Sequence, residues 1–326
     1  MKIIRSLEDL HPDSRRASVA IGVFDGVHIG HREILRRLAS HAARTEAETV
    51  LFTFDPHPRT VLHPDHPPRI LTTLPERCAI FERLGVEKVV ILPFNRQLAA
   101  TGAEEFVRET LIGRVRMSTL VVGYDFRLGR EREGNGGLLQ QMAQATPFRL
   151  DLVPPFLVDG RPVKSTWIRD EVEKGDVSAA ARLLERYHSL AGVVVAGDGR
   201  GRTLGYPTAN LVVTEEGKLW PRRGVYAAFA ERGEGLCPSV VNIGVRPTFE
   251  KGGDPAAMVE AHLIRFTGNL SGEKMRLYFV ERIREERTFP SAEALAEQIG
   301  KDRDRAVQVL STAERKNSLY RNFGIW

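Results

Sequence analysis

Cysteine and long apolar runs are both scarce in this 326-residue sequence. The two cysteines, Cys78 and Cys237, lie far apart and outside any CxxC pattern, so neither a disulfide framework nor a cysteine zinc site is predicted. No segment approaches the roughly 18 uncharged apolar residues that would span a bilayer, and the first residues lack the apolar stretch of a signal peptide. We therefore expect a cytoplasmic protein without a membrane partner.

Aromatic residues make up 7% of the chain and form no regular stripe along its apolar segments. Small barrels that bind single-stranded nucleic acid generally stack bases on aromatic side chains, so the composition argues against such a partner. The formal net charge is +5, but basic and acidic residues are interspersed, as in RDEVEKGD and ERIREER. We expect phosphate-bearing small molecules rather than nucleic acid to bind. Binding of RNA or single-stranded DNA by a basic barrel stays open as an alternative.

Short apolar segments in the first half of the chain recur at intervals that leave room for a helix between them. This spacing is typical of strands joined by crossover helices, and it predicts an α/β domain with a parallel sheet covered on both faces. Two helix starts carry the capping-box pattern, Thr73 with Glu76 and Thr101 with Glu104. The predicted strands of this domain are residues 18–24, 49–54, 87–94, 118–124 and 148–153.

Beyond about residue 190 the apolar segments lie closer together, with turns rich in glycine and proline and no room for helices between them. Strands this close in sequence predict an antiparallel barrel or sandwich. The amphipathic segment 291–310, with Ser291 as its cap, predicts a closing helix. We place the change of domain between residues 175 and 190, with domains 1–184 and 185–326. The predicted strands of the second domain are residues 191–197, 209–213, 224–230, 239–244, 258–266 and 274–283.

The segment GVFDGVHIGH follows the first predicted strand and precedes a helical pattern. In an α/β sheet this strand-to-helix turn is the usual place for a phosphate. Gly26 and Gly30 allow close backbone approach, and His28 and His31, three residues apart, project from nearly the same side of the helix start. Two imidazole donors and the helix dipole would hold a nucleotide phosphate. Local hydrogen bonds at the helix start, or a zinc site completed by His57, are the alternatives.

In this form the segment resembles the nucleotidyltransferase signature of the bacterial bifunctional riboflavin kinase/FMN adenylyltransferase family, also called FAD synthetases. The segments TFDPHP (53–58), GYDFRLG (123–129) and STWIR (165–169) follow in that family's order, so the resemblance covers the whole first domain. It implies a Rossmann-like nucleotidyltransferase domain in which an FMN phosphate oxygen attacks the α-phosphorus of ATP and releases pyrophosphate. Such transfers depend on positioning and charge stabilisation, which histidine donors, a helix N-terminus and Mg²⁺ supply.

The resemblance also implies roles for residues of the first domain. His28 and His31 would hold the phosphates of ATP, and Ser165, Thr166 and Arg169 would form a second phosphate grip at a later helix start. Taken alone, the serine and threonine are as typical of plain helix caps, and the arginine of a surface charge. The other positions expected at ATP are Gly22, Phe24, Gly30, Gly123 and Asp125, and Phe126 is expected at the flavin. The last two are also typical of core and turn positions.

A second glycine-rich segment, GDGRGRTLGYPTANL, opens the second domain. It is neither a P-loop nor a dinucleotide fingerprint, because no lysine follows the glycines and Leu204 replaces a third glycine. Glycines and arginines still wrap phosphates with backbone amides and charge. Pro207 constrains the backbone before Thr208 and Asn210, whose oxygens alternate onto one side of a starting strand and suit a hard cation such as Mg²⁺. A plain turn into a strand is the alternative.

This segment resembles the family's riboflavin kinase loop and PTAN motif, and VNIGVRPTF (241–249) and VEAHLIRF (259–266) match the kinase module in order and spacing. The resemblance implies a six-stranded antiparallel β-barrel with terminal helices, in which Thr208 and Asn210 hold Mg²⁺ with ATP. The other positions expected at ATP are Gly199, Gly201 and Arg202, and Asn242 and Arg246 are expected at the flavin.

Alternation along residues 259–263 places Val259, Ala261 and Leu263 on one face of a strand and Glu260 and His262 on the other. Glu260 resembles the family's general base, which accepts the proton of the riboflavin 5'-hydroxyl as that oxygen attacks the γ-phosphate of ATP. An acidic residue on an exposed strand face is the alternative interpretation.

Four residues depart from the family pattern. Lys164 stands where a serine is usual, although lysine also binds phosphate. Glu185 and Tyr187 replace glycine and proline at the domain junction, and Ser271 replaces a tyrosine. None of these positions is a proposed Mg²⁺ ligand or base.

The sequence as a whole predicts a two-site enzyme that makes FMN from riboflavin and then FAD from FMN, with ATP as co-substrate in both reactions. An alternative keeps only the first domain active, on pantetheine phosphate or a nicotinamide nucleotide, with the barrel as an accessory. The oligomeric state is not indicated.

Overall fold

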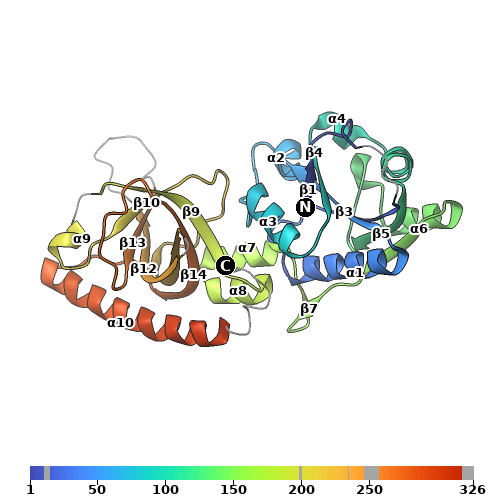
Figure 1. Cartoon of the computed structure of the whole chain (residues 1–326). Coiled ribbons are helices and arrows are strands. Elements are labelled where there is room, and N and C mark those ends of the chain that lie inside the picture. Colours follow the sequence, from blue (N-terminus) through green and yellow to red (C-terminus); the bar gives the residue numbers. More distant parts are fainter. Residues whose placement is uncertain (11–14, 198–199, 234, 246–256, 318–326) are drawn as a thin grey trace. The chain divides into compact units, whose positions relative to one another are not determined.

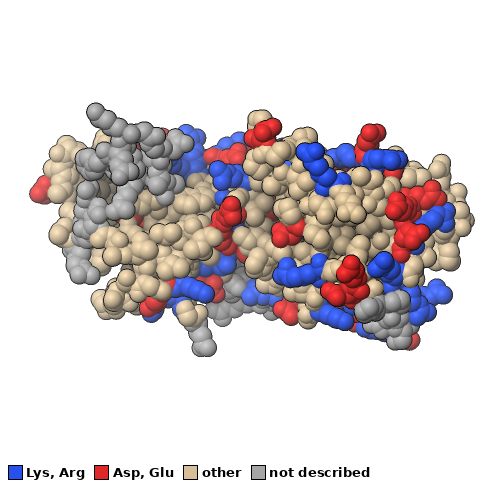
Figure 2. All heavy atoms as spheres, turned by 90° about the horizontal axis from the view of Figure 1, so that it is seen from above, with Lys and Arg blue, Asp and Glu red and all other residues tan. Residues whose placement is uncertain are grey.

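The computed structural model describes residues 1–10, 15–197, 200–233, 235–245 and 257–317. Contacts divide the chain into two compact units, Met1–Ser165 and Thr166–Trp326, and each unit has its own hydrophobic core. No described helix combines the length and the apolar character that a bilayer crossing requires. Acidic and basic side chains are interspersed over the face seen in Figure 2, as the sequence indicated.

The first unit is built on a parallel sheet whose strands run in the order β1-β4-β3-β2-β5-β6 (Figure 1). The chain proceeds outward from β2 through β3 and β4, and later through β5 and β6 on the other side, so the strand order reverses beside β2. Ligands of such sheets bind outside the carboxyl ends of the strands at this reversal. The strands are β1 (Lys2–Ile4), β2 (Ala17–Ile21), β3 (Glu48–Asp55), β4 (Lys88–Pro93), β5 (Met117–Gly123) and β6 (Arg149–Val153).

Helices cover both faces of this sheet, which confirms the predicted α/β class. Ala20 of β2 packs with α1 and α3, whereas its neighbours Val19 and Ile21 pack with η1 and α6, because successive side chains of a strand point to opposite faces. The remaining elements of the unit are α1 (Ile29–Thr45), α2 (Pro58–Leu62), α3 (Leu74–Arg83), α4 (Arg96–Ala100), α5 (Ala103–Glu105), the π-helix η1 (Phe106–Arg114), the 3₁₀ helix η2 (Arg130–Arg132), α6 (Gly136–Ala145) and the hairpin of β7 (Leu157–Val158) and β8 (Arg161–Pro162).

One of the two predicted capping boxes is present. The Thr73 hydroxyl accepts the Glu76 amide at 3.4 Å, and the Glu76 carboxylate accepts the Thr73 amide at 2.8 Å. The prediction for Thr101 and Glu104 is wrong, because Thr101 ends α4 and Gly102 precedes α5. The first amide of α5, from Ala103, donates instead to the Glu133 carboxylate at 2.8 Å. The cap of α5 is therefore the carboxylate of Glu133, which is distant in sequence, and not the nearby Thr101 that the local pattern predicted.

The second unit contains a closed antiparallel barrel in the order β10-β13-β12-β11-β14-β9. All six strands were predicted, but the one-turn helix α9 between β9 and β10 was not. Helix α10 lies along the outside of the barrel (Figure 1), and its start is capped by the Ser291 hydroxyl, as predicted. The elements are α7 (Ser165–Lys174), α8 (Val177–Leu184), β9 (His188–Val195), α9 (Arg200–Thr203), β10 (Ala209–Val213), β11 (Gly224–Arg232), β12 (Gly235–Val245), β13 (Ala257–Leu263), β14 (Lys274–Arg284) and α10 (Ala292–Asn317).

Two residues that depart from the family pattern lie at the end of α8. Glu185 ends this helix with a φ of 52°, in the left-handed region that glycine adopts at least cost. The ring of Tyr187 lies 6.4 Å from that of Phe229 and packs against the cluster beneath α10. Glu185 thus keeps the backbone conformation of a helix-ending glycine while carrying a side chain.

Candidate functional site

The histidine turn connects β2 to α1. His28 is the cap of α1, and its Nδ1 accepts the backbone N–H of His31 at 3.3 Å. The two imidazole rings are stacked, with centroids 3.6 Å apart and planes 18° from parallel. A Cβ at Gly30 would lie 3.2 Å from the His28 ring, so the glycine leaves room for this packing. The two histidines project from the same side of the helix start, as predicted, and His28 also makes the local hydrogen bond that was the alternative.

This cap decides which imidazole nitrogen of His28 carries the proton. Because Nδ1 accepts a hydrogen bond, the neutral ring has its proton on Nε2, where it is a donor. The amide groups of the first turn of α1 point the same way as the positive end of the helix dipole. The turn therefore combines imidazole donors with a helix N-terminus, a combination suited to phosphate oxygens.

Phe24 supports the turn from below. Its backbone has a φ of 53°, and its side chain is only 2% exposed. The ring meets His31 edge-on at 5.2 Å and Phe81 at 5.8 Å, and it covers Gly22, where a Cβ would lie 3.0 Å from the ring. The side chain of Phe24, expected at ATP, is therefore buried and packs against His31 and Gly22.

Asp25 ties the histidine turn to a segment far away in sequence. Its buried carboxylate accepts the backbone amides of Leu71 at 3.0 Å and Thr72 at 2.9 Å, and the Thr72 hydroxyl at 3.1 Å. The Gly26 amide donates to the same hydroxyl at 2.8 Å. Sequence reasoning included this aspartate in the motif without a role, because nothing in the local pattern points to residues 71 and 72.

Arg77 of α3 is a second support that sequence reasoning missed. It is 4% exposed and donates to the Val23 carbonyl at 2.6 Å and the Thr53 hydroxyl at 3.1 Å. Burial lowers the pKa of Arg77, and the nearby carboxylates of Asp25 and Asp55 oppose that shift. The TFDPHP segment thus contributes Thr53 to the underside of the turn. His57, the alternative zinc ligand, caps α2 by accepting the Arg59 amide at 3.1 Å.

The segment after β5 lies at the same edge of the sheet, because β5 pairs with β2 in parallel. Gly123 ends β5, and Asp125 accepts a hydrogen bond from the Lys164 ammonium at 2.8 Å, which raises the pKa of Lys164. Lys164, which stands where the family usually has serine, therefore forms an ion pair with Asp125, a residue expected at ATP. Phe126 is half-buried against the core beneath this edge.

Ser165 is joined to the histidine turn by its hydroxyl, which donates to the Asp25 carbonyl at 2.8 Å. Thr166 and Arg169 follow in α7 and belong by their contacts to the second unit. Of the predicted second phosphate grip, the structure thus brings the serine to the histidine turn.

A row of polar side chains crosses three neighbouring strands of the barrel. Asn210 of β10 is the cross-strand partner of Glu260 of β13, which is also the partner of Asn242 of β12. Directly paired residues share a face of a sheet, so the three side chains lie side by side. The alternation predicted for β13 is confirmed, because Val259 and Ala261 are fully buried and Glu260 is half-buried between them.

Asn242 is the third member of this polar row. Its Nδ2 lies 3.5 Å from the Glu286 carboxylate, at the limit of a hydrogen bond. Its Oδ1 is buried without a hydrogen-bond partner within the described part of the chain. A buried amide oxygen of this kind is a ready acceptor for a ligand.

A cavity of about 480 Å³ opens beside this row, lined by the ends of β9, β10 and β13 and by residues 266–271. Thr208 and Asn210 both line it, and so does Ser271, the departure from a usual tyrosine. A Cβ at Gly197 would overlap Asn210, and one at Gly201 would overlap the Tyr206 carbonyl and approach the Thr208 hydroxyl to 3.1 Å. The absence of a side chain at Gly197 and Gly201 lets the backbone at these two positions lie close to Asn210 and Thr208.

These donors fit a magnesium ion. A threonine hydroxyl and an asparagine carbonyl are hard oxygen ligands, and Mg²⁺ usually takes few protein ligands together with substrate phosphates. His262, on the same face as Glu260, is bonded through Nδ1 to the Pro207 carbonyl at 2.8 Å and so holds β13 to the segment before Thr208. The expected positions Gly199 and Arg246, and the side chain of Arg202, lie outside the described residues.

Comparison with known proteins gives matches to both units. A family model described as FAD synthetase matches residues 10–167, and one described as riboflavin kinase matches residues 184–310. The bifunctional riboflavin kinase/FMN adenylyltransferase of Pseudomonas fluorescens is 36% identical over 302 residues, covering 93% of this chain and 96% of that protein. The chain belongs to this bifunctional family.

Other members extend the match. The bifunctional riboflavin kinase/FMN adenylyltransferase of Escherichia coli K12 is 34% identical over 304 residues, with the same coverage of both chains. A crystal structure from Streptococcus pneumoniae, named a macrolide-efflux protein, is 30% identical with a TM-score of 0.83, and it covers 93% of this chain and 97% of its own. The family resemblance and the fold class predicted from sequence are confirmed.

Within this family fold, the structure separates supports from surfaces that a ligand can reach. Asp25, Arg77 and the ring of Phe24 are buried beneath the histidine turn. Thr208 and Asn210 line an open cavity, and Glu260 lies next to Asn210 without lining it. Of the residues expected to be catalytic, His31 at the histidine turn and Glu260 in the barrel are partly exposed to solvent, whereas His28 is only 5% exposed.

Proposed function

We propose that this chain phosphorylates riboflavin to FMN at the barrel and adenylylates FMN to FAD at the histidine turn, with ATP as co-substrate in both reactions. The observation that carries the proposal is that each candidate site lies inside its own family match: the histidine turn lies within residues 10–167 and the polar row of the barrel within residues 184–310. The adenylyltransferase is assigned to domain 1–184 and the kinase to domain 185–326, and both act in the cytoplasm.

In the kinase reaction, Glu260 accepts the proton of the riboflavin 5'-hydroxyl while that oxygen attacks the γ-phosphate of ATP. Its place beside Asn210 and Asn242 supports this role, because amide neighbours orient a carboxylate without neutralising it. Mg²⁺ bound with ATP supplies positive charge to the transferring phosphate, and Thr208 and Asn210 would hold it. Gly201 keeps the backbone of the loop close to these donors. Asn242 contacts the flavin.

In the adenylyltransferase reaction, His28 and His31 donate to phosphate oxygens of ATP while an FMN phosphate oxygen attacks the α-phosphorus and pyrophosphate leaves. The stacked rings and the N-terminus of α1 support this role, since both hold donors ready before the ligand arrives. Ser165, joined to Asp25, begins the second phosphate grip, which Thr166 and Arg169 complete. Gly123 and Asp125 border the nucleotide, and Lys164 holds Asp125 in place. Phe126 borders the flavin.

Incubating the purified full chain with riboflavin and MgATP tests the proposal. Chromatography should detect FMN first and FAD afterwards, and FAD alone when FMN replaces riboflavin. Appearance of neither product would refute the flavin assignment. FAD from FMN without any FMN from riboflavin would leave the barrel as an accessory and refute the kinase half.

A further inference from the structure

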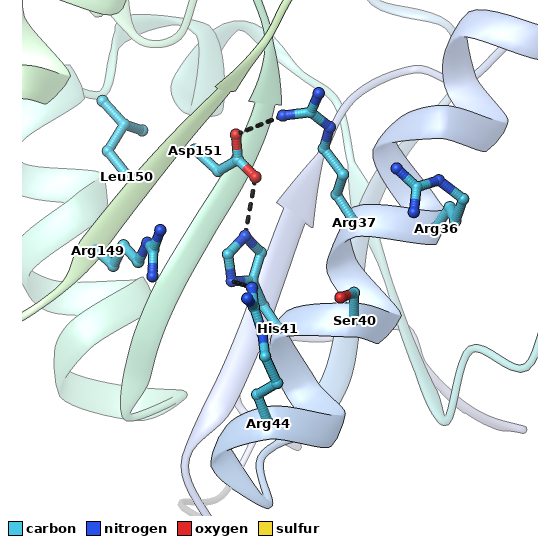
Figure 3. Close-up of a pocket in the computed structure, with 8 residues that line it drawn as sticks. All are labelled: Arg36, Arg37, Ser40, His41, Arg44, Arg149, Leu150 and Asp151. Carbon is cyan, nitrogen blue, oxygen red and sulfur yellow. Dashed lines mark hydrogen bonds and ion pairs between the residues drawn. The ribbon is translucent and has the colours of Figure 1, made fainter.

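A basic pocket lies beside the C-terminal half of α1, away from the histidine turn (Figure 3). The cavity has a volume of about 310 Å³, at the lower end of the range for small-molecule sites. Arg44 comes 13 residues after His31 on the same helix, which separates the two by roughly 20 Å at 1.5 Å per residue. The lining residues are Arg36, Arg37, Ser40, His41 and Arg44 of α1 and Arg149, Leu150 and Asp151 of β6.

Two carboxylates neutralise only part of the positive charge here. Glu33, on the same helix, accepts from Arg36 at 2.7 Å and from Arg37 at 2.8 Å, and the hydrogen bond from Arg36 is the main cause that lowers the pKa of Glu33 to about 2. Asp151 accepts from Arg37 at 3.1 Å and from His41 at 2.8 Å, as the dashed lines in Figure 3 show. Four guanidinium groups facing two carboxylates leave a formal charge of +2 when the imidazole is neutral.

Arg44 is oriented by a histidine rather than by an acid. Its Nη2 donates to Nδ1 of His41 at 2.9 Å, while the other nitrogen of that ring bonds to Asp151. An imidazole that accepts at Nδ1 and donates at Nε2 is the neutral tautomer, so it aims the guanidinium without cancelling its charge.

Arg149 lines the pocket from the opposite wall, on β6 (Figure 3). Among the described residues no carboxylate pairs with Arg44 or with Arg149. Arg44 lies in the last turn of α1, where a cation also offsets the helix dipole, but Arg149 is on a strand and has no such compensation. The guanidinium charges of Arg44 and Arg149 lie on opposite walls of the pocket and repel each other, and an anion placed between them removes that repulsion.

We propose that this pocket binds the diphosphate group of a small molecule. Guanidinium groups match phosphate oxygens with two parallel hydrogen bonds, and Ser40 adds a hydroxyl on the same helix face. Leu150 is the one apolar side chain in the lining, so the pocket offers no flat surface on which a base or flavin ring would stack. Inorganic pyrophosphate and the diphosphate of ADP present this chemistry, and the site does not depend on the catalytic assignments above.

Titration calorimetry of the full chain with inorganic pyrophosphate, without divalent cations, tests the proposal. The wild type should bind one more equivalent of pyrophosphate than the double variant R44Q/R149Q, or should bind that equivalent at least about tenfold more tightly. The reason is that each charged hydrogen bond that is lost weakens binding by about tenfold. The control variant R83Q/R108Q removes the same charge from exposed positions of the first unit and should match the wild type. Equal binding by wild type and R44Q/R149Q would overturn the proposal.

The same titrations with ADP and with adenosine identify the recognised group. Loss of one equivalent of both pyrophosphate and ADP in R44Q/R149Q, with no adenosine binding at the site, supports recognition of the diphosphate. A loss seen only with ADP, or only with an RNA oligonucleotide, overturns it. Initial rates of FMN and FAD formation without added pyrophosphate should not change in the double variant.

Crystals of the wild-type chain soaked in selenate give a test that requires no variant to fold. An anomalous peak between the guanidinium groups of Arg44 and Arg149 is expected. A map with selenate elsewhere and none between these two groups would overturn the proposal.

Discussion

The two candidate sites are assembled in opposite ways. The histidine turn of the α/β unit places its two imidazoles within one short stretch of chain, three residues apart at a helix start. The polar row of the barrel takes one residue from each of three strands, with Asn210 and Glu260 fifty positions apart in sequence. A local site leaves a motif in the sequence, whereas a site built across strands leaves only the order of separate segments.

The difference also extends to what holds each site in place. The histidine turn depends on long-range hydrogen bonds of buried groups: its own Asp25 carboxylate accepts the amides of Leu71 and Thr72, and the guanidinium of Arg77 donates to the Val23 carbonyl. The barrel row depends on the ladder hydrogen bonds of the strands that carry it, so its geometry follows from register alone. Five predictions would break or sharpen this comparison.

The largest effect is expected from Glu260→Gln. Gln keeps the size of the side chain but cannot accept the hydroxyl proton, so FMN formation should fall by roughly 10² to 10⁴-fold. FAD formation from supplied FMN should stay within about twofold of wild type, because the two sites are in different units. Rates measured separately with riboflavin and with FMN check this, and a matched fall in both rates would show that the sites are not independent.

His31→Ala should produce the converse pattern. Loss of one preorganised donor to the phosphates should lower FAD formation by roughly 10² to 10³-fold and spare FMN formation. His66→Ala, at an exposed position of the same unit, is the matched control and should behave as wild type. An unchanged rate of FAD formation in His31→Ala would remove the turn from the mechanism.

Asp25→Asn should weaken the local site through its support. The amide places N–H groups against the backbone donors of Leu71 and Thr72, which should lower the stability of the first unit by about 2 to 3 kcal/mol. Hydrogen exchange should rise in residues 22–31 and 70–73 and stay unchanged in the barrel strands. Protection lost equally in both units would contradict a local support.

The two units should also respond to opposite extremes of pH. Burial raises the pKa of Tyr226 in the barrel to about 12, and its hydroxyl donates to the Arg222 carbonyl. The neutral phenol therefore stabilises the barrel fully below about pH 10, and this contribution, about 2 kcal/mol, is lost as the pH rises towards 12. The pKa of Glu33 in the first unit is lowered to about 2, so its contribution is full above about pH 4.5 and is lost as the pH falls towards 2.

Glu33 is partly exposed, so solvent screening reduces its contribution to about 1 kcal/mol. Urea unfolding at several pH values measures both the alkaline loss of stability assigned to Tyr226 and the acid loss assigned to Glu33. All three tryptophans fall within the residue range of the second unit, and Trp167 and Trp220 lie in its described part, so tryptophan fluorescence follows that unit, while circular dichroism follows both units. Tyr226→Phe should abolish the alkaline loss and Glu33→Gln the acid loss. A variant with the pH dependence of wild type would contradict its assignment.

The smallest effect is expected from Glu185→Gly at the end of α8. The left-handed φ of 52° strains a residue with a Cβ, so glycine should raise the stability of the second unit by about 0.5 to 1 kcal/mol. Denaturant titration of tryptophan fluorescence measures it. Glu185→Ala is the control: it retains the Cβ and should give no gain, and equal gains in both variants would show that the side chain beyond Cβ, rather than backbone strain, was responsible.

The predictable parts of the fold are those that repeat along the chain. Strand spacing identified five strands of the sheet and all six of the barrel, because alternation and interval are local signals. Strand β1 was missed because three residues, Lys2–Ile4, are too few to show a period. The prediction that Thr101 caps a helix was wrong, because the amide of Ala103 at the start of α5 donates to Glu133, thirty residues away.

The same division holds for the candidate sites. The pairing of His28 with His31 followed from their spacing on a helix start, and the alternation of Val259, Glu260 and Ala261 from the period of a strand. The supports Asp25 and Arg77 could not be predicted, because their partners lie 24 to 54 residues away. Long-range hydrogen bonds of buried groups leave no local pattern.

The closed barrel has a consequence for how kinase competence arises. Asn210 and Glu260 become neighbours only when β10 pairs with β13, and these two strands are far apart along the chain. Non-local strand pairings of this kind form late in folding, because the entropy cost of closing the intervening loops must first be overcome. During refolding, turnover of riboflavin should therefore begin only after β10 has paired with β13.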